Sequence, residues 1–216
     1  MKENYIIRNE TPEDWREVEE LTRNAFWNKY VPGCNEHYLA HVMRSHPDFI
    51  PELDFVIECG GKIIGSIMYT KAKLTDEQGI QKPVLSFGPI SVHPDYQRKG
   101  YGRLLIEHSS EKARELGYDL TVIMGDPSNY IPYGFKSCKR YNICLANGAY
   151  PSSMLVKELR ENSLDGRKWF FTESELYDID REKAEDYDKH FKSMKKEYRT
   201  SQELFYINSH SVMEDE

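Results

Sequence analysis

A short loop rich in basic residues and glycine carries the clearest chemical signal of this 216-residue chain. It reads Gln97-Arg98-Lys99-Gly100-Tyr101-Gly102-Arg103. Apolar residues at helical spacing follow, so we expect a helix that begins near Tyr101 and ends at Gly117. A helix N-terminus leaves about four backbone N–H groups without partners and favours negative charge. The loop therefore predicts an anion site, in which glycines let a diphosphate approach the backbone and basic side chains surround it.

A plainer interpretation of this loop is a tight strand-to-helix turn with solvated Lys and Arg side chains. The preceding residues, 84–92, are apolar enough for a strand that is buried on at least one face. Pro89 removes one backbone donor from the middle of that strand, which predicts a bulge or bend. Such a bend would splay the strand from the next apolar stretch, residues 120–124, and leave backbone groups of residues 90–92 unpaired.

The elements around the loop predict an α/β (α+β) fold with a mixed, mostly antiparallel central sheet and helices on both faces. A strand is expected at residues 5–8, followed by a helix with Thr11 as its N-cap, and by a second helix over 35–45. Gly60-Gly61 predicts a hairpin that joins strands 53–59 and 62–70. The helix over 101–116 connects two strands, which implies parallel pairing with a right-handed crossover.

Two motifs, the loop at 97–103 with the strand before it and a later segment at 125–135, resemble those of the GNAT family of N-acetyltransferases. The loop resembles that family's acyl-CoA loop, Gln/Arg-x-x-Gly-x-Gly/Ala, and Gly-Pro-Ile-Ser-Val-His-Pro at 88–94 resembles its fourth strand. Gly-Asp-Pro-Ser-Asn-Tyr-Ile-Pro-Tyr-Gly-Phe at 125–135 resembles its fifth strand, short helix and closing Gly-Phe. The resemblance covers residues 4–146, and the remaining tail is similar to that of a bacterial subgroup of predicted acetyltransferases with a C-terminal extension.

The resemblance implies that acetyl-CoA is the acyl donor and that the fourth and fifth strands splay to admit its pantetheine arm. The backbone N–H of Ile90 would stabilise the developing charge on the thioester oxygen. Tyr130 matches the family's general-acid tyrosine, with an aromatic lid over the pantetheine channel as its alternative role. Tyr133 is the neighbouring candidate, and it could equally be a packing residue. The implied cofactor-binding set is Ile90, Ser91, Val92, Gln97, Arg98, Lys99, Gly100, Tyr101, Gly102, Arg103, Asn129 and Tyr133.

The general base is less well determined by the sequence. Some relatives place a Glu early in the fourth strand, where this chain has Ser86. Asp126 and His93 are the nearby candidates, with Asp126 as the predicted base, and loss of the proton through water alone remains open. No Cys–His arrangement suggests a covalent intermediate. In relatives the link between the first two helices overhangs the acceptor pocket, so Trp27, Tyr30 and Tyr38 either line that pocket or pack the helix pair.

Composition excludes several classes of function. The chain has 29 Lys and Arg against 36 Asp and Glu, a net charge of -7, which argues against a nucleic-acid surface. It shows no apolar leader and no run of 18 apolar residues, so we expect a cytoplasmic protein without a membrane partner. Its 4 Cys and 7 His show no metal-ligand spacing, and we expect no metal.

These observations together predict an acetyl-CoA-dependent N-acetyltransferase, in which a primary amine attacks the thioester directly in a ternary complex. Residues 1–147 form the predicted acetyltransferase core, and 148–216 an extension of strands and a charged helix, frayed from residue 209. A small-molecule amine and a protein N-terminus or lysine both remain possible acceptors, and the extension is a possible homodimer face. The alternatives are a non-catalytic acyl-CoA sensor and a transferase that uses a longer acyl-CoA.

Overall fold

The computed structural model describes residues 4–214, which form one nine-stranded sheet covered by helices. The strand order is β1-β2-β3-β4-β5-β8-β6, and β9 pairs with both β3 and β7. Only β4–β5 and β7–β9 are parallel among the described pairs, which confirms the predicted mixed, mostly antiparallel sheet. The strands are β1 Tyr5–Asn9, β2 Phe55–Cys59, β3 Lys62–Asp76, β4 Gln81–Val92, β5 Leu120–Met124, β6 Lys136–Ser137, β7 Ile143–Cys144, β8 Met154–Glu158 and β9 Trp169–Thr172.

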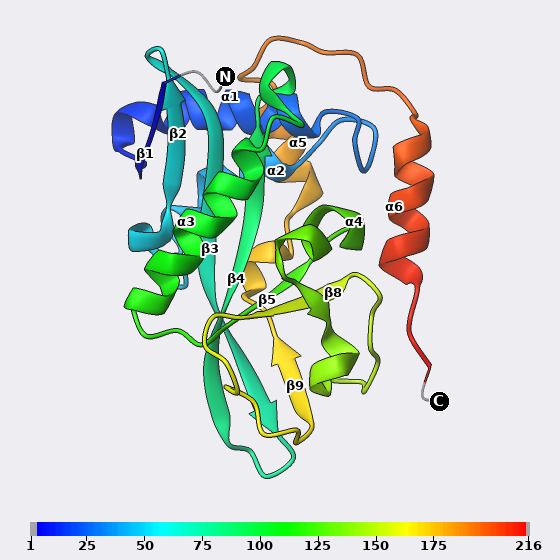
Figure 1. The fold of residues 1–216 in the computed structure, drawn as a ribbon. Helices are drawn as coiled ribbons and strands as arrows, with labels where there is room; N and C mark the ends of the chain where they lie inside the picture. Colours follow the sequence, from blue (N-terminus) through cyan, green and yellow to red (C-terminus); the bar gives the residue numbers. More distant parts are fainter. Residues whose placement is uncertain (1–3, 215–216) are drawn as a thin grey trace.

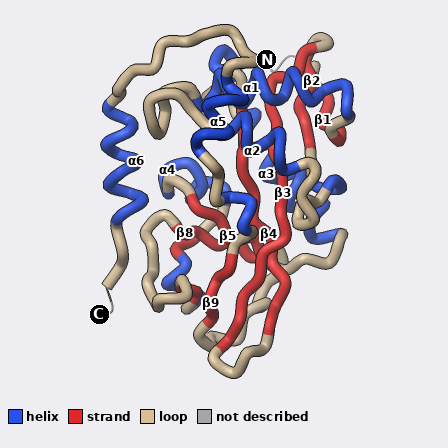
Figure 2. Tube along the Cα trace, turned by 180° about the vertical axis from the view of Figure 1, so that it is seen from behind, coloured by secondary structure: helices blue, strands red, loops and turns tan. Residues whose placement is uncertain are grey.

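Helices cover both faces of the sheet, as expected. Val56 of β2 packs with Val18 of the first helix, whereas its neighbour Ile57 packs with Leu105 of the third. Because successive strand residues point to opposite faces, these two helices lie on opposite sides of the sheet. α3 lies in front of the sheet in Figure 1. Figure 2 shows the opposite face, on which α1, α2 and α5 lie. The helices are α1 Trp15–Phe26, α2 Glu36–Met43, α3 Tyr101–Glu115, α4 Pro127–Tyr130, α5 Arg181–Asp188 and α6 Thr200–His210.

The start of α1 is fixed by hydrogen bonds around Asp14. A 3-10 turn, Pro12–Asp14, precedes the helix, and the backbone N–H of Thr11 donates to Asp14 Oδ2 at 2.8 Å. Arg8 Nη1 donates to the same carboxylate at 2.6 Å. The hydrogen bond from Arg8 lowers the pKa of Asp14 to about 2, against the opposing effect of burial. The predicted N-cap region is therefore confirmed, with an ion pair to β1 that the sequence did not indicate.

β4 carries the predicted bulge, next to the predicted splay. Ile90 pairs with Ile67 and Phe87 with Tyr69, so three steps along β4 match two along β3. The extra residue lies at Gly88-Pro89. β4 and β5 share a single register pair, Leu85 with Thr121, whereas β5 pairs with β8 along its whole length. Beyond that pair the two parallel strands separate, which confirms the splayed fourth and fifth strands (Figure 1).

Strands from beyond residue 147 pair with strands from before it. β8 lies between β5 and β6, and β9 extends the far half of β3, which runs to Asp76 instead of ending near residue 70. The division at 147/148 stays a prediction. Fraying from residue 209 is wrong for the described part, because Met213 N donates to Tyr150 O at 2.9 Å. Residues 215–216 lie outside the described chain.

α6 was not predicted, and β7 has only two residues. In the part of the chain that the structure describes, no helix combines the length and apolar character that a membrane span requires.

Candidate active site

The glycine loop adopts the backbone needed for an anion site at the start of α3. Gly100 is the N-cap residue with φ 86°, and Arg98 has φ 59°, so both lie in the left-handed region. The first backbone N–H to bond within the helix is that of Leu104, which donates to Gly100 O at 3.2 Å. A Cβ on Gly102 would lie 3.8 Å from Val92 Cγ2, so this glycine leaves the first turn bare beside the end of β4. The loop therefore presents first-turn N–H groups next to the splay.

The side chains of the loop take different roles. Arg98 and Lys99 are exposed, and Lys99 Nζ lies 5.2 Å from the centroid of the Tyr96 ring. Arg103 is also exposed and pairs with Glu107 at 2.7 Å. Tyr101 is only 3% exposed and packs in the core, so its side chain points away from the loop surface. These three cations surround the turn, and Tyr101 contributes only its backbone there.

Gln97 ties the loop to β4. Its Nε2 donates to the carbonyl of Val92 at 3.0 Å. This contact holds the exposed loop in position relative to the end of the strand. Among the described residues, the site residues Val92, Gln97, Gly100 and Gly102 are thus brought together as the sequence predicted.

The open edge of β4 follows from hydrogen-bond alternation. His93 N donates to Ile64 O of the β3 side at 2.9 Å, and such contacts alternate along an antiparallel pair. Ser91 therefore faces β3 with its backbone, and its Oγ donates to Thr22 Oγ1 of α1 at 3.0 Å. Ile90 and Val92 direct their backbone groups to the opposite side, where β5 has already diverged. The structure thus places Ile90 and Val92 at the open edge and turns Ser91 away from it.

Tyr130 lies across the mouth of the splay. Its ring is 5.9 Å from that of Phe87 on β4 and 5.7 Å from Phe135, measured between centroids. On the β5 side it lies against Gly125, where an added Cβ would overlap Cε2 of the tyrosine and lie 3.1 Å from Cδ2. Burial, and then the charge of Asp126, raises the pKa of Tyr130 to about 12. The phenol therefore keeps its proton throughout the neutral range.

The other residues of the 125–135 motif serve the short helix. Asp126 Oδ1 accepts from both Ser128 N at 2.9 Å and Ser128 Oγ at 2.8 Å, so it caps α4. Asn129 is exposed, and Tyr133 packs half-buried against the main core. His93 Nδ1 is likewise engaged, accepting from Asp95 N at 3.3 Å. Both candidate bases thus have a structural partner.

A carboxylate that the sequence did not single out lies at Ser86. Ser86 Oγ donates to Glu173 Oε1 at 3.3 Å, from the segment just after β9. Burial raises the pKa of Glu173 to about 7, opposed by the Ser86 hydrogen bond. Nearby, Tyr177 OH donates to Gly88 O at 3.3 Å. No local motif could have revealed Glu173, because its position depends on how β9 pairs with β3.

A pocket of about 350 Å³ opens beside Tyr177, between α2 and the segment after β9. Two carboxylates and one guanidinium face it, and its lining is Asn35, Glu36, Leu39, Tyr177, Asp178, Ile179 and Arg181. Trp27, Tyr30 and Tyr38 were expected either to line the acceptor pocket or to pack the helix pair. Burial, and then the charges of Tyr130, Glu36 and Asp126, raise the pKa of Tyr30, so this residue lies near the splay. All three also have packing partners. Trp27 Nε1 donates to Lys195 O at 2.9 Å, Tyr30 packs on Phe205, and Tyr38 on Tyr187.

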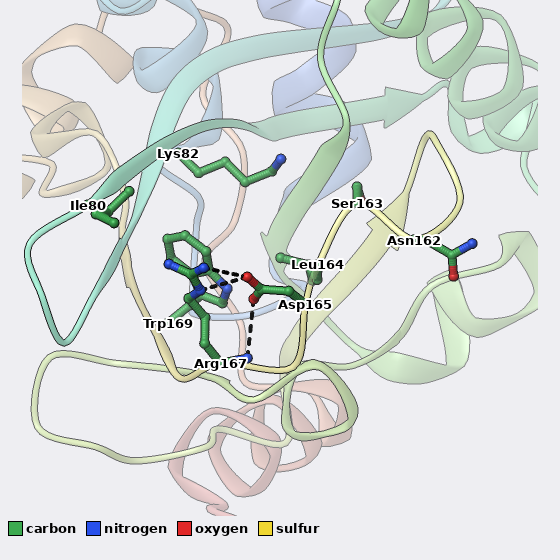
Figure 3. A pocket seen from close by; sticks show the side chains of 8 residues that line it. All are labelled: Ile80, Lys82, Asn162, Ser163, Leu164, Asp165, Arg167 and Trp169. Carbon is green, nitrogen blue, oxygen red and sulfur yellow. Dashed lines mark hydrogen bonds and ion pairs between the residues drawn. The ribbon is translucent and has the colours of Figure 1, made fainter.

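A second hollow, of about 270 Å³, lies near the β3–β4 turn (Figure 3). Arg167 pairs there with Asp165 at 2.6 Å and with Asp76 at 2.7 Å. Its lining residue Lys82 precedes Val92 by ten residues of one strand, a separation of roughly 33 Å at the usual rise. This hollow is remote from the splay and takes no part in the candidate site.

The structure also reveals a Cys–His–Asp arrangement that the sequence analysis missed. Cys34 Sγ lies 3.5 Å from His37 Nδ1, and His37 Nε2 lies 3.2 Å from Asp188 Oδ1. Burial raises the pKa of Cys34 and lowers that of His37 to about 4. The thiol therefore stays protonated at neutral pH, and this group packs α2 against α5 without an activated nucleophile. No group of residues suited to hold a metal occurs within residues 4–214.

Comparison with known proteins agrees with this geometry. Residues 13–130 match the model of the family described as Acetyltransferase (GNAT) family. The uncharacterized N-acetyltransferase YhbS of Escherichia coli K12 is 26% identical over 162 residues, covering 74% of this chain and 91% of that protein.

Two solved structures share the fold. The crystal structure of Escherichia coli YhbS in complex with CoA has a TM-score of 0.70 at 24% identity, over 83% of this chain and 94% of that one. A GNAT family acetyltransferase from Brucella melitensis, in complex with acetyl-CoA, has a TM-score of 0.62 at 22% identity, over 82% and 99% of the two chains. At these identities the likeness establishes the arrangement of the sheet and helices.

Proposed function

The chain belongs to the GNAT acetyltransferase family, and from that premise we propose that it transfers an acetyl group from acetyl-CoA to a primary amine by direct attack in a ternary complex. The observation that carries the proposal is the open backbone edge at Ile90 and Val92, which ends beside the glycine turn of α3. The relatives named above, crystallised with CoA and acetyl-CoA, support the choice of donor.

The chain's own groups fit an acyl-CoA substrate in three places. The first-turn N–H groups after Gly100 bind the diphosphate, with exposed Arg98 and Lys99 beside them. The outward backbone groups of Ile90 and the N–H of Val92 pair with the amide-bearing arm as a strand would, whereas the Val92 carbonyl already accepts from Gln97 Nε2. The Ile90 N–H then lies where the thioester oxygen gains charge, and removal of such a donor typically costs about 10²–10³ in rate.

Tyr130 serves the leaving group in this proposal. Its hydroxyl donates a hydrogen bond to the departing sulfur and acts as the general acid when the C–S bond breaks. A pKa of about 12 keeps the donor protonated at every neutral pH.

The acceptor amine enters, in this proposal, through the pocket beside Tyr177. Glu36 and Asp178 in its lining favour a cationic amine, and Arg181 favours an acceptor that also carries an anionic group. A small molecule of this kind and a protein N-terminus or lysine are both compatible with it. We also retain a homodimer as a prediction, because α6 leaves Leu204 62% and Tyr206 58% exposed. Sedimentation velocity that shows only a monomer would refute the homodimer.

A screen of acetyl-CoA turnover across amine classes, with free CoA thiol as the readout, tests the proposed function. We expect release of CoA that depends on the amine, and loss of turnover in Tyr130→Phe with acetyl-CoA affinity retained. Tight binding of acetyl-CoA without release for any amine would favour the non-catalytic sensor. Competition between acetyl-CoA and longer thioesters distinguishes the remaining alternative, a transferase for longer acyl groups. Cytoplasmic location remains a prediction.

A further inference from the structure

A carboxylate from the C-terminal part of the chain lies within hydrogen-bond distance of Ser86 on β4. We propose that Glu173 is the proton acceptor for the attacking amine, an inference that rests on the proposed acetyltransferase function. Glu173 Oε1 accepts a hydrogen bond from Ser86 Oγ at 3.3 Å. Ser86 stands four residues before Ile90 in β4, and it has no carboxylate of its own. The segment after β9 thus places a carboxylate beside β4, which has none of its own.

The path of the chain explains how Glu173 reaches β4. Thr172 pairs with Lys73 of β3, and the chain then crosses β3 toward β4. Ser174 Oγ holds this crossing by donating to Asp48 Oδ2 at 2.7 Å. Three residues later, Tyr177 OH donates to Gly88 O and lies 3.2 Å from Thr70 Oγ1. Glu173 is therefore held between Thr172, which is paired in the sheet, and Ser174, which is bonded to Asp48.

The surroundings of Glu173 suit a base that works at neutral pH. Its side chain is half-buried, and burial raises its pKa to about 7, close to the value that serves general-base catalysis best. Tyr177 faces it from the following 3-10 turn, and the charge of Glu173 contributes to the raised pKa of that phenol. The other ionisable groups around the segment are Asp48, engaged by Ser174, and Lys71 of β3, whose Nζ donates to Pro47 O at 3.0 Å. Ser86 therefore supplies the direct hydrogen bond to Glu173.

Tyr177, whose pKa the nearby charge of Glu173 helps to raise after burial, lines the acceptor pocket and donates to Gly88 O. From Ser86 to Ile90 the strand covers at most roughly 13 Å, and the bulge at Gly88-Pro89 shortens this. A proton that leaves the amine near the Ile90 N–H therefore reaches Glu173 through water.

The proton count closes with this assignment. An alkylammonium ion loses one proton through water to Glu173, which frees the nitrogen lone pair. The N–C bond forms and the C–S bond breaks, and the departing sulfur takes a proton from the Tyr130 hydroxyl. The second nitrogen proton then returns through water to the Tyr130 oxygen and restores the phenol. Glu173 then releases its proton to solvent. The products are the amide, CoA thiol and one proton.

Two other carboxylates near the site, Asp126 and Glu36, hold the starts of helices. Asp126 caps α4 through both contacts with Ser128. Glu36 lines the pocket, but its Oε2 accepts from the backbone N–H of Asn35 at 3.0 Å at the start of α2. Glu173, by contrast, has a single hydroxyl partner.

The test is the pH profile of kcat/KM with one amine acceptor and saturating acetyl-CoA. In the wild type we expect an acid limb near pH 7, because a base with that folded pKa is protonated below it. E173Q should lower the rate by about 10²–10⁴-fold and remove this limb, leaving only the limb of the amine itself near pH 10. S86A should move the limb to higher pH, because the Ser86 hydrogen bond lowers the pKa of Glu173.

Two controls separate chemistry from folding. E175Q changes an exposed carboxylate two residues away and should leave the profile unchanged. Acetyl-CoA affinity should stay within threefold in E173Q, and the S86E/E173Q double variant should regain part of the limb. If the wild type turns over the amine and E173Q keeps the same acid limb, the proposed role of Glu173 is overturned but the acetyltransferase function is not. A wild type that binds acetyl-CoA but turns over no amine overturns both this role and the proposed function.

Discussion

A methyl group added at Gly125 should displace the Tyr130 ring and so lower kcat while the tyrosine itself stays unchanged. Gly125 follows β5, and the Tyr130 ring lies directly over its Cα. The Cβ of Gly125→Ala would overlap Cε2 of the ring and lie 3.1 Å from Cδ2 and 3.3 Å from Cζ. The backbone of Gly125 does not lie in the left-handed region that disfavours alanine, so the ring, and not the strand, must move.

The size of the displacement sets the expected effect. Carbon atoms in contact prefer about 3.5–4.0 Å, so the ring must shift by about 1 Å from Gly125. Phe87 and Phe135 flank the ring at 5.9 and 5.7 Å, which limits the directions open to it. Misplacement of a reacting group by about 1 Å can cost about 10²-fold in rate, equivalent to about 2.7 kcal/mol. We therefore expect kcat of G125A to fall about 100-fold.

A double-mutant cycle with Tyr130→Phe checks this reasoning. If G125A acts through the hydroxyl of Tyr130, it should lower kcat less than threefold further in the Y130F background. The contrasting variant is G102A, whose Cβ would meet Val92 Cγ2 only at 3.8 Å, beside the proposed diphosphate site. G102A should raise the acetyl-CoA Kd, measured by calorimetry, and G125A should not. Multiplicative effects of G125A and Y130F on kcat would refute the claim that G125A acts through the Tyr130 hydroxyl.

Three further predictions concern the ion pair of Asp14, the turn at Gly100 and the buried cysteines. Asp14→Asn should lower the free energy of unfolding at pH 7 by about 2 kcal/mol in urea titrations, because folding lowers the pKa of Asp14 from 3.8 to about 2. The stability that this ionised carboxylate contributes is present above pH 4 and is lost as the pH falls through 2. Gly100→Ala should cost about 1–2 kcal/mol of stability, because φ is 86°, and raise the acetyl-CoA Kd; Gly79→Ala, with φ 83° in an exposed turn, should share the first effect only. The native protein should react slowly with a disulfide reagent for thiols and the unfolded protein fast, because all four cysteines are buried: Cys34, Cys59, Cys138 and Cys144. An equally fast reaction of the native protein would contradict this burial and complicate any assay of CoA thiol.

Local sequence determined the half of the site that is built from consecutive residues. Pro89 indicated the bulge in β4, and the glycine loop with the apolar spacing after it indicated the start of α3 at Tyr101. Both features depend on backbone conformations that a few neighbouring residues impose. Tyr101 shows the limit of such reasoning, because it lies within the loop motif and yet its side chain is 3% exposed in the core.

Register between distant segments determined the rest, and a single sequence carries little information about it. Glu173 reaches Ser86 across 87 residues of chain only because β9 pairs with the far half of β3. The Cys34–His37 contact with Asp188 likewise requires α5 to pack on α2. α6 was missed because its apolar residues, including Leu204 and Ile207, remain exposed and show no helical periodicity toward a core.

The two halves of the site have different physical requirements, which explains why they come from different parts of the chain. In the proposed reaction, binding of the donor uses backbone groups at Ile90, Val92 and the turn at Gly100, so it requires no ionisable side chain on β4. Removal of the amine proton needs one ionisable side chain with a shifted pKa, and any segment that covers β4 can provide it. Ser86 leaves room for that side chain, and the segment after β9 fills it with Glu173. A chain without a carboxylate on β4 can therefore keep the same donor site and still supply a base.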